Sequence, residues 1–370
     1  GGIIINKSGS RVSYADIHYS SSTIYAGAID TVTINNCLIS NNSSTADGIR
    51  INDNLKYFTI RENTIRANSG YGIHKVSGNT SNDGNSTNST GGCEIVGNTI
   101  YAYTGIRIYG TYNARVDSNT ILLKDQGSVG IQNYNSQYSS YSNNLIMPEN
   151  EFDWYDTGIS IGYNFYTTIH GNEIRNSKGT GIDMHHARND TVTQNIVTRD
   201  WHCDHDDSHV AFYLHDYSWN NYISGNVINT NNGPQGADND GQGYRRTHNF
   251  SGFHGDSNGR DNTYVRNSVT IGIPYDDNSA HNNRGFAYLG ENAVLEGNKV
   301  AVYNYSNNNS ASEDDWRGRY HSCIYGYGQV TSTNDTLIMS DNTMGIYANS
   351  LKMSGTVISN SNSYQTEYFK

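Results

Sequence analysis

The sequence predicts an all-β solenoid, a fold in which short strands stack coil upon coil, and three observations support this prediction. Apolar residues alternate with polar ones over short segments, almost no segment has helical periodicity, and two short motifs recur along nearly the whole chain. Such repeats bury every second side chain of each strand. A stable core is therefore compatible with a chain of which only 35% is hydrophobic.

The first motif is apolar-x-x-Asn-x-apolar, as in TIRENTI around Asn63 and EIVGNTI around Asn98. We expect this asparagine to occupy the left-handed bend between two strands, and its side chain to bond to equivalent side chains of neighbouring coils. The motif continues at Asn119, Asn144, Asn172, Asn195, Asn226, Asn267, Asn298 and Asn342, with Cys37 and Thr356 in the same slot.

The second motif is Gly-apolar-x-apolar, as in GISI at Gly158. From Gly105 to Asn119 and from Gly181 to Asn195 the spacing is 14 residues, whereas from the asparagine to the next glycine it varies from 7 to 26. One half of each coil is thus fixed in length, and the other half accepts insertions.

These repeats, 21 to 28 residues long between Asn98 and Asn195, describe one coil of a β-solenoid. Leucine-rich repeats have a similar length, but their regular Leu-x-x-Leu-x-Leu pattern is absent. We predict a single domain over residues 1–370 with about eleven coils. Loop insertions are expected at 77–92, 198–210 and 229–251.

The composition disfavours several classes of protein. With 24 Lys and Arg against 35 Asp and Glu, the net charge of −11 disfavours nucleic-acid binding, which needs a broad basic field. No apolar run of about 18 residues predicts a membrane span, and no leader is recognisable, so we expect a soluble mature protein or an excised domain. The predicted class of β-helix protein, argued below, is expected to be extracellular or at the cell surface. Four widely spaced cysteines indicate neither a zinc knuckle nor a disulfide scaffold, and we expect Cys37 and Cys93 to be small core residues.

Because the strands stack in register, the outward residues of the glycine-marked strands can be read as rows. Histidine, tyrosine and aspartate concentrate in the middle of these rows, beyond what a merely solvated strand needs. The first row runs Arg50, His74, Arg107, Gln132, Ser160, Asp183, Tyr213, His254, Ala287. The second row runs Asn52, Val76, Tyr109, Tyr134, Gly162, His185, His215, Asp256, Leu289.

Two of the insertions precede strands of these middle rungs. They contain WHCDHDDSH and NGPQGADNDGQGYRRTHNF, and nine of the 13 histidines lie between His170 and His254. The first insertion predicts a Ca²⁺ or Zn²⁺ site with Asp204, His205 and Asp206 as ligands, with a merely solvated loop as the alternative.

Three polysaccharide chemistries fit these residues. β-Elimination needs a neutralised carboxylate, a base for the C5 proton and an acid for the leaving oxygen, and C5 epimerisation needs similar groups. His185 fits the base, and Tyr213 or Tyr244 fits the acid. Arg188, Arg245, Arg246 or a metal ion fits the neutralising group.

Hydrolysis instead needs two carboxylates on opposite sides of the glycosidic bond, which Asp183 with Asp206, Asp207 or Asp256 supplies. Across these chemistries, the candidate catalytic residues are Asp183, His185, Tyr213, His215 and Asp207. The candidate substrate-binding residues are Arg107, Tyr109, Tyr134, Arg188, Tyr244, Arg245, Arg246, His254 and Asp256.

The x-I-x-x-N-x-I and G-I-x-I coils resemble the right-handed parallel β-helix superfamily over nearly the whole chain. This superfamily includes pectate and alginate lyases, polygalacturonases, mannuronan C5-epimerases, phage tailspikes and archaeal disaggregatases. The resemblance implies the right-handed parallel β-helix fold, whereas the function has to be argued from the site.

The segment GIDMHHARNDTVTQNIV is similar to the mannuronan C5-epimerase pattern G-F-D-P-H-E, with Asp183 and His185 on its Asp and His. The resemblance implies that Asp183 contacts the substrate carboxylate or positions the proton donor, and that His185 acts in proton transfer. Met184 and His186 depart from the Pro and Glu of the pattern.

We therefore predict an enzyme that degrades a uronic-acid-containing polysaccharide by β-elimination. The alternatives are a disaggregatase-like glycoside hydrolase of matrix polysaccharide, a C5-epimerase, and a non-catalytic β-helix such as an adhesin or tailspike shaft.

Overall fold

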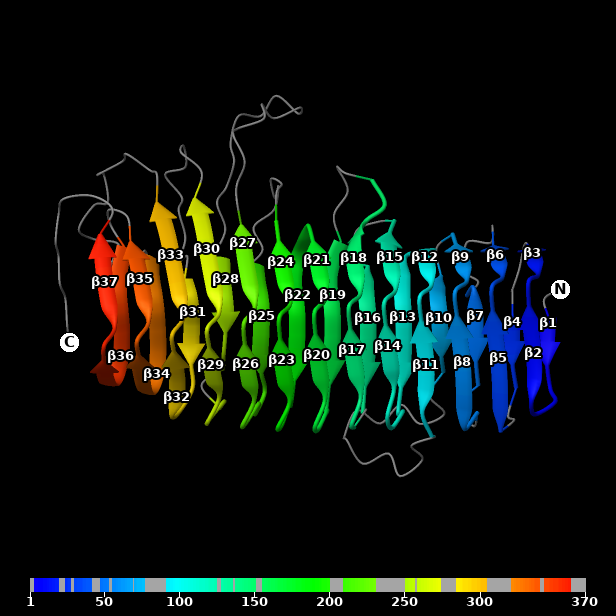
Figure 1. Ribbon diagram of the computed structural model, residues 1–370, viewed down its shortest axis with the longest axis horizontal. Coiled ribbons are helices and arrows are strands. Elements are labelled where there is room, and N and C mark those ends of the chain that lie inside the picture. Colours follow the sequence, from blue (N-terminus) through cyan, green and yellow to red (C-terminus); the bar gives the residue numbers. More distant parts are fainter. Residues whose placement is uncertain are drawn as a thin grey trace. The chain divides into compact units, whose positions relative to one another are not determined.

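The computed structural model describes residues 3–19, 24–27, 30–41, 47–52, 55–68, 70–76, 91–124, 128–135, 137–150, 155–199, 209–230, 250–256, 258–273, 284–304, 321–339 and 343–360. Their regular structure is made of strands (Figure 1), and no helix among them has the length and apolar character to cross a membrane. The chain divides into two compact units, Gly1–Ser177 with Asp183–Thr191 (unit 1) and Lys178–Ile182 with Val192–Lys370 (unit 2).

Each coil of unit 1 has three strands, called here the first, second and third strand. The first strands are β1 (Ile3–Ile5), β4 (Ile24–Ala26), β7 (Ile49–Ile51), β10 (Tyr71–Lys75), β13 (Thr104–Tyr109), β16 (Val129–Tyr134), β19 (Tyr155–Gly162) and the end of β22 (Ser177–His185). The second strands are β2 (Ser10–Ser13), β5 (Thr31–Asn35), β8 (Tyr57–Arg61), β11 (Cys93–Val96), β14 (Arg115–Asp117), β17 (Ser140–Ser142) and β20 (Thr168–His170). The third strands are β3 (Asp16–Tyr19), β6 (Leu38–Asn41), β9 (Thr64–Ala67), β12 (Thr99–Ala102), β15 (Thr120–Leu123), β18 (Leu145–Pro148) and β21 (Glu173–Arg175).

Unit 2 repeats the same coil. Its first strands are β25 (His209–His215), β28 (Phe250–His254), β31 (Arg284–Leu289) and the beginnings of β34 (His321–Thr333) and β36 (Thr343–Ser354). Its second strands are β23 (Thr191–Thr193), which starts at the last residue of unit 1, β26 (Tyr222–Ser224), β29 (Thr263–Val265), β32 (Ala293–Glu296) and the ends of β34 and β36. Its third strands are β24 (Ile196–Thr198), β27 (Val227–Thr230), β30 (Ser268–Ile273), β33 (Lys299–Asn304), β35 (Thr336–Met339) and β37 (Val357–Asn360).

Strands of the same kind pair in parallel within each unit, which is the predicted parallel β-helix. Among the described residues the third strands number thirteen, so the coils exceed the predicted number of about eleven. The predicted insertions at 198–210 and 229–251 fall after third strands, between β24 and β25 and between β27 and β28, and most of each lies outside the described residues.

The core is a stack of aliphatic side chains. In unit 1 the third strands place six isoleucines in register and fully buried: Ile39, Ile65, Ile100, Ile121, Ile146 and Ile174. Burial of each contributes roughly 1.5–3 kcal/mol before the entropy of ordering is counted. The alternation iBeB of β9 shows how one polar neighbour faces outward for each buried isoleucine.

The glycine of the second motif is explained by close packing. A Cβ added to Gly105 would lie 2.5 Å from the carbonyl oxygen of Gly130 and 2.5 Å from Cγ2 of Ile121. Any larger residue would therefore push the first strand away from both its neighbouring coil and the third-strand isoleucine.

The predicted asparagine stack is confirmed. The backbone N–H and side-chain Nδ2 of Asn98 both donate to Oδ1 of Asn119 at 3.0 Å, and Asn119 donates in the same way to Asn144. The expected position of the left-handed bend is wrong, because it falls one residue earlier, at Gly97 (φ 67°) and Ser118 (φ 56°). A bend at that position leaves the asparagine side chain free to point into the stack.

The expected place of Asn342 in this stack is also wrong. Asn298 donates instead to Oδ1 of Asp335, from its backbone N–H at 2.7 Å and from Nδ2 at 2.9 Å. The Ser332 hydroxyl donates to the other carboxylate oxygen at 2.7 Å and also contacts Thr356 at 2.8 Å. Asn342 lies outside the described residues, whereas Thr356 adjoins the slot as expected.

Cys37 and Cys93 are buried free thiols, as expected, and so is Cys323. Burial raises the pKa of the Cys93 thiol to about 12. Buried apolar surroundings make these thiols packing groups rather than nucleophiles. Cys203 lies outside the described residues.

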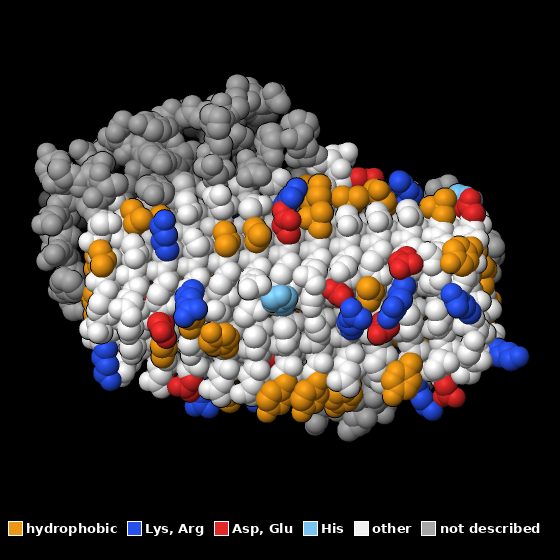
Figure 2. Space-filling model, viewed as in Figure 1, with side chains coloured by type: hydrophobic (Ala, Val, Ile, Leu, Met, Phe, Trp, Pro, Cys, Tyr) orange, Lys and Arg blue, Asp and Glu red, His pale blue; other side chains and the backbone are white. Residues whose placement is uncertain are grey.

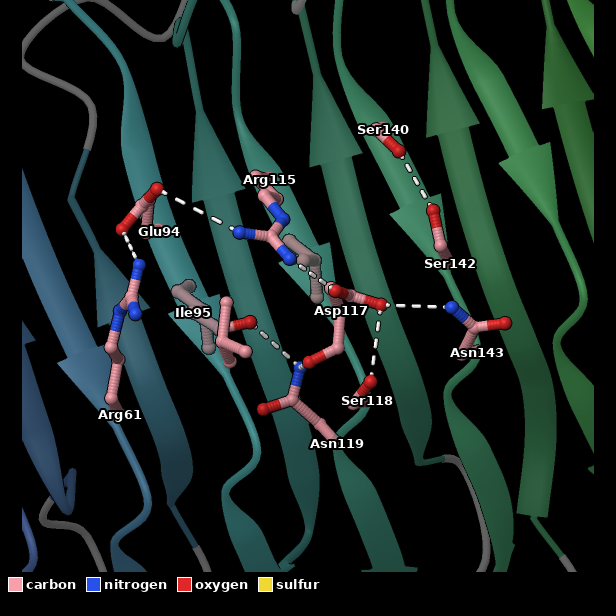
Figure 3. A network of polar contacts seen from close by, with 12 residues as sticks. Arg61, Glu94, Ile95, Arg115, Asp117, Ser118, Asn119, Ser140, Ser142 and Asn143 are labelled. Atoms are coloured by element: carbon pink, nitrogen blue, oxygen red, sulfur yellow. Dashed lines mark hydrogen bonds and ion pairs between the residues drawn. The ribbon is translucent and has the colours of Figure 1, made fainter.

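The second strands of unit 1 carry a network of ion pairs on their outer face (Figure 3). Arg115 contacts Asp117 at 2.6 Å and Glu94 at 3.9 Å, and Glu94 also pairs with Arg61. Burial alone would raise the pKa of Asp117, but hydrogen bonds from Asn143 and Arg115 outweigh it and lower the pKa. The charges of this face are therefore satisfied within the protein.

Charged side chains of both signs are scattered over the described residues in the view of Figure 2. No broad basic field appears among them on that face.

Candidate functional site

The first strands of unit 1 bring together three of the predicted substrate-binding residues. Arg107 on β13 is in register with Gln132 on β16, and Tyr109 is in register with Tyr134. The two tyrosine rings stack with their centroids 5.7 Å apart and an interplanar angle of 15°. The rows read from the sequence are therefore correct at this position.

Arg107 is held between two tyrosines. Its Nε donates to the hydroxyl of Tyr109 at 3.0 Å, and its guanidinium also donates to the hydroxyl of Tyr71. Burial alone would lower the pKa of Arg107, but the bonds and charges of Tyr109 and Tyr71 outweigh it and raise the pKa. The side chain is thus a fixed cation, and no carboxylate among the described residues forms an ion pair with it.

Asp183 and His185 lie at the end of β22, both half-buried. The hydroxyl of Ser160 on β19 donates to Oδ2 of Asp183 at 3.1 Å, which confirms the predicted pairing of these rungs. Gly162 lies between Tyr134 and His185, because a Cβ added there would be 2.5 Å from the Tyr134 ring and 3.6 Å from Cβ of His185. The order Tyr109, Tyr134, Gly162, His185 is therefore confirmed.

A second imidazole adjoins His185. The rings of His185 and His186 are 4.5 Å apart and nearly perpendicular, and the ring of Tyr163 stacks on His186 at 4.4 Å. Tyr163 and His186 both have positive φ, 55° and 52°, so the same sharp bend closes the two neighbouring first strands. Arg188, also predicted to bind substrate, lies beyond this bend with its guanidinium carbon 5.5 Å from the Phe165 ring.

Unit 2 gathers the other predicted residues that the structure describes. Tyr213 is in register with His254, and their rings meet edge to face at 4.8 Å. The ring of His215 stacks on Tyr213 at 4.3 Å, and its Nδ1 lies 3.2 Å from a carboxylate oxygen of Asp216. Asp256 accepts the backbone N–H of Asp216 at 3.2 Å.

His254 is an uncharged member of this group. Burial, followed by the positive charge of Arg284, lowers its pKa from 6.5 to about 4. At neutral pH the imidazole therefore has one donor and one acceptor nitrogen rather than two donors. Such a group fits hydrogen bonding to a hydroxyl better than pairing with an anion.

Sequence reasoning missed several residues of these clusters. Tyr71, which fixes Arg107, directly precedes the second-motif glycine Gly72, and that position was not included in either row. In unit 2, Leu289 is fully buried rather than outward, because the register shifts between Phe286 and Leu289. Tyr288 takes a positive φ of 51° there and faces outward in place of Leu289.

The remaining predicted residues lie outside the described part of the chain. They are Asp204, His205, Asp206 and Asp207 of the first insertion and Tyr244, Arg245 and Arg246 of the second. The Ca²⁺ or Zn²⁺ site stays a prediction.

The stacked parallel coils make this chain a right-handed parallel β-helix protein. Residues 91–273, just under half of the chain, match the family model described as periplasmic copper-binding protein (NosD). No curated protein matches the sequence.

Three solved structures are similar to this chain at low identity. The surface adhesin PfbA of Streptococcus pneumoniae is 11% identical over 97% of this chain and 86% of its own, with a TM-score of 0.40. The catalytic domain of a GH87 α-1,3-glucanase in complex with nigerose is 12% identical over 96% and 64%, with a TM-score of 0.29. The periplasmic alginate epimerase AlgG is 8% identical over 89% and 77%, with a TM-score of 0.24.

Imidazoles are ligands that copper takes in proteins. Unit 1 has His185 and His186 side by side, and unit 2 has His215 next to Asp216. Within either unit taken by itself, the described residues bring no three His, Cys, Asp or Glu side chains close enough to hold one ion. Copper binding is what the family description states of that family.

Proposed function

We propose that the chain acts on an anionic polysaccharide at the first-strand face of unit 1, and that the anionic sugar is a uronic acid. The observation that carries this proposal is Arg107, a fixed cation without a carboxylate partner among the described residues, next to the stacked rings of Tyr109 and Tyr134. Arginine pairs with a carboxylate through two parallel hydrogen bonds. Tyrosine rings offer the apolar face on which a pyranose packs.

The spacing of the coils supports a chain-like ligand. Successive rungs are about 4.8 Å apart, which is close to the length of one sugar along an extended polysaccharide. A polymer that runs across the first strands would present one sugar to each rung, passing from Arg107 and Tyr109 over Tyr134 to His185. The order of these residues is the order of their coils.

At the end of this row, Asp183 and His185 are proposed to carry out β-elimination. His185 removes the C5 proton, the C5–H electrons form the C4–C5 double bond, and the C4–oxygen bond breaks. The leaving oxygen takes up a proton from a tyrosine hydroxyl or from water. Asp183, held by Ser160, positions the sugar through its hydroxyls.

The proposed location is extracellular or at the cell surface, because polysaccharides of this kind are found there. The description of the matched family as periplasmic supports a place outside the cytoplasm.

The experiment incubates the protein with polygalacturonate, alginate and a glucuronic-acid polymer, and with starch as a neutral control. Unsaturated products are followed by ultraviolet absorbance and new reducing ends are assayed in parallel, each with and without EDTA. Both signals are expected to rise on at least one acidic polymer. Reducing ends without unsaturated product would show hydrolysis and overturn the elimination step.

Variants test the placement of the site. His185→Ala is expected to lower turnover at least about 100-fold, the usual contribution of a proton-transfer group. Arg107→Ala is expected to act mainly on KM, because it binds the sugar away from the reacting bond. His18→Ala is the control, since this exposed histidine is on a third strand and pairs with Asp16. Equal losses in His18→Ala and His185→Ala would show that the effect is not local to the site.

A non-catalytic carbohydrate-binding role is the second candidate, and the stacked pair Tyr109 and Tyr134 favours it equally. It predicts that an acidic polymer binds without either product signal, and that Arg107→Ala abolishes this binding while His185→Ala does not. A gel-shift assay in polymer-containing gels measures both variants directly.

A further inference from the structure

Unit 2 contains a buried arginine that neither the sequence motifs nor the proposed function uses. Arg284 is the first residue of β31, and only 5% of it is exposed. Its guanidinium carbon lies 4.6 Å from the ring centroid of Tyr288 and 4.1 Å from that of Tyr325. The cation is thus held between two aromatic rings.

This cation has no anionic partner among the described residues. No ion pair or hydrogen bond involves its side chain there, and its Nε is buried without a hydrogen-bond partner. Two tyrosine faces compensate part of the lost hydration, but a buried charge without hydrogen bonds or a counter-charge is unfavourable. Buried charges in proteins are as a rule paired, so this unpaired guanidinium marks a place where an anionic ligand would be favourable.

Two further polar groups near Arg284 are also unsatisfied. Ser322 on β34 is in register with Arg284, and its hydroxyl is buried without a partner. His254 packs against Tyr288 with the ring centroids 4.6 Å apart, and its Nδ1 is likewise buried and without a partner. Native proteins rarely leave several buried polar groups of one neighbourhood unpaired, unless a ligand or water meets them.

The aromatic surface continues outward from Arg284 to solvent. Tyr325 stacks on Tyr347 with centroids 4.9 Å apart, and Tyr327 lies 5.2 Å from Tyr288. Tyr327 and Tyr347 are 43% and 39% exposed. A ligand with a flat apolar face can therefore rest on exposed rings while a charged substituent reaches inward.

We propose that Arg284, with Tyr288 and Tyr325, forms a binding site for the oxyanion of an acidic sugar. The carboxylate of a uronic acid or the sulfate of a sulfated sugar accepts hydrogen bonds from the guanidinium, and the sugar ring packs on the tyrosines. The Ser322 hydroxyl supplies a hydrogen bond to a remaining oxygen of the anion, and His254 supplies one to a hydroxyl of the sugar. The site lies in unit 2 and does not depend on turnover at Asp183 and His185.

The experiment compares the wild-type chain with Arg284→Met and with the control Arg260→Met. Arg260 also packs on an aromatic ring, with its guanidinium carbon 4.0 Å from Trp219, but it is exposed. Sodium glucuronate, sodium sulfate and glucose are titrated in chloride buffer while the melting temperature and the heat of binding are recorded. The two anions distinguish carboxylate from sulfate recognition, and glucose measures binding that needs no charge.

In wild type and Arg260→Met, at least one anion is expected to bind and to raise the melting temperature, because a ligand of the native state stabilises it. Arg284→Met is expected to bind that anion at least tenfold more weakly. Without ligand, its melting temperature should equal or exceed that of wild type, since it removes an unpaired buried charge.

Three results would overturn the site: no anion binding to the wild type, equal binding to Arg284→Met, or equal binding of glucose and glucuronate. The general stabilising effect of sulfate on proteins appears in all three chains; it is measured with Arg284→Met, which lacks the proposed site, and is subtracted from the other two. Because the readout is binding rather than turnover, a protein without lyase activity still tests this site. Conversely, loss of this site leaves the elimination assay interpretable.

Discussion

Burial determines the charge of His254, and this has a measurable effect on stability. The folded protein binds the proton of this imidazole only near pH 4, whereas the unfolded chain binds it near 6.5. As the pH falls from 6.5 to about 4, the unfolded state therefore takes up a proton that the folded state does not. The stability that depends on neutral His254 is complete above pH 6.5 and is lost over this interval.

We predict that wild type loses about 3 kcal/mol of unfolding free energy across this interval through His254 alone. His254→Gln keeps a polar group of similar size without titrating, so its stability should fall less steeply. Urea denaturation of both proteins at several pH values measures the difference. Parallel curves would contradict the assignment.

Gly162 has no side chain and so leaves space for the Tyr134 ring next to His185. A methyl group at this position would lie 2.5 Å from the ring, so we predict that Gly162→Ala displaces Tyr134. Loss of one aromatic contact should weaken binding of the acidic polymer roughly two- to tenfold. Gly272→Ala is the matched control, because its new Cβ meets only the Thr230 carbonyl oxygen at 3.4 Å. Affinity electrophoresis compares the two, and equal affinities would contradict the role of Tyr134.

Single residues of the site could be predicted from the sequence where the coils are regular. The pairs Tyr109 with Tyr134 and Ser160 with Asp183 follow from a constant register of one coil. Tyr288 could not, because a shift in register inside β31 turns it outward, and the alternation of apolar and polar residues carries no sign of that shift. Arg284 was missed because it precedes the glycine and so belongs to neither row.

At the scale of the elements, the asparagine stack connects the second and third strands of successive coils. Asn119 accepts two hydrogen bonds from Asn98 and donates to the carbonyl of Ile95 at 2.8 Å and to Asn144. Removal of this side chain would leave buried backbone groups of two coils without partners. Unsatisfied buried groups cost more than the net gain of the bonds themselves.

We therefore predict that Asn119→Ala lowers the unfolding free energy by about 3 kcal/mol. Ser142→Ala should change it by less than about 1 kcal/mol, because that hydroxyl contacts only Ser140 on the partly exposed outer face. Thermal and urea unfolding of both variants measures these effects. A small effect of Asn119→Ala would show that the neighbouring coils adjust to its loss.

The number of coils was underestimated because the terminal coils do not carry both motifs. The first strand β4 has no second-motif glycine, and Asp335 and Thr356 replace the asparagine near the C-terminus. The Asp335 carboxylate accepts the same two hydrogen bonds from Asn298 that an asparagine side-chain oxygen would accept. The fold therefore tolerates aspartate at this position, although the change makes the sequence motif unrecognisable there.

For the whole molecule, the net charge of −11 opposes the approach of an acidic polymer. Arg107 and Arg284 are local cations within a negative average field. Salt screens the long-range repulsion over about 8–10 Å and weakens contacts at half-buried or buried arginines much less.

We predict that added salt up to about 0.15 M accelerates association with polygalacturonate, or leaves it unchanged. A protein that binds through a broad basic surface shows the opposite, a steep loss of affinity with salt. Stopped-flow measurements of tyrosine fluorescence at several salt concentrations distinguish the two. A strong decrease of the association rate with salt would contradict local recognition.

The fold as a whole was predictable because the coil motif recurs many times in the sequence. An error at a single position therefore does not alter the predicted fold. The chemistry was not predictable to the same degree, because the two insertions with the densest His, Asp and Arg residues have no periodicity to place them.

In unit 2, the asparagine stack has a direction. Each asparagine from Asn195 onward donates its amide to the oxygen of the next, so the positive ends of all side-chain amide dipoles point towards the C-terminus. The last of them, Asn298, meets the carboxylate of Asp335, and opposite charge is favourable at the positive end of aligned dipoles. Asp335 has no side-chain N–H to pass the bond onward. The row of amide hydrogen bonds therefore ends at the Asp335 carboxylate. A duplicated coil with its own asparagine would extend this row if inserted before Asp335, whereas after Asp335 it would receive no side-chain hydrogen bond from the preceding coil.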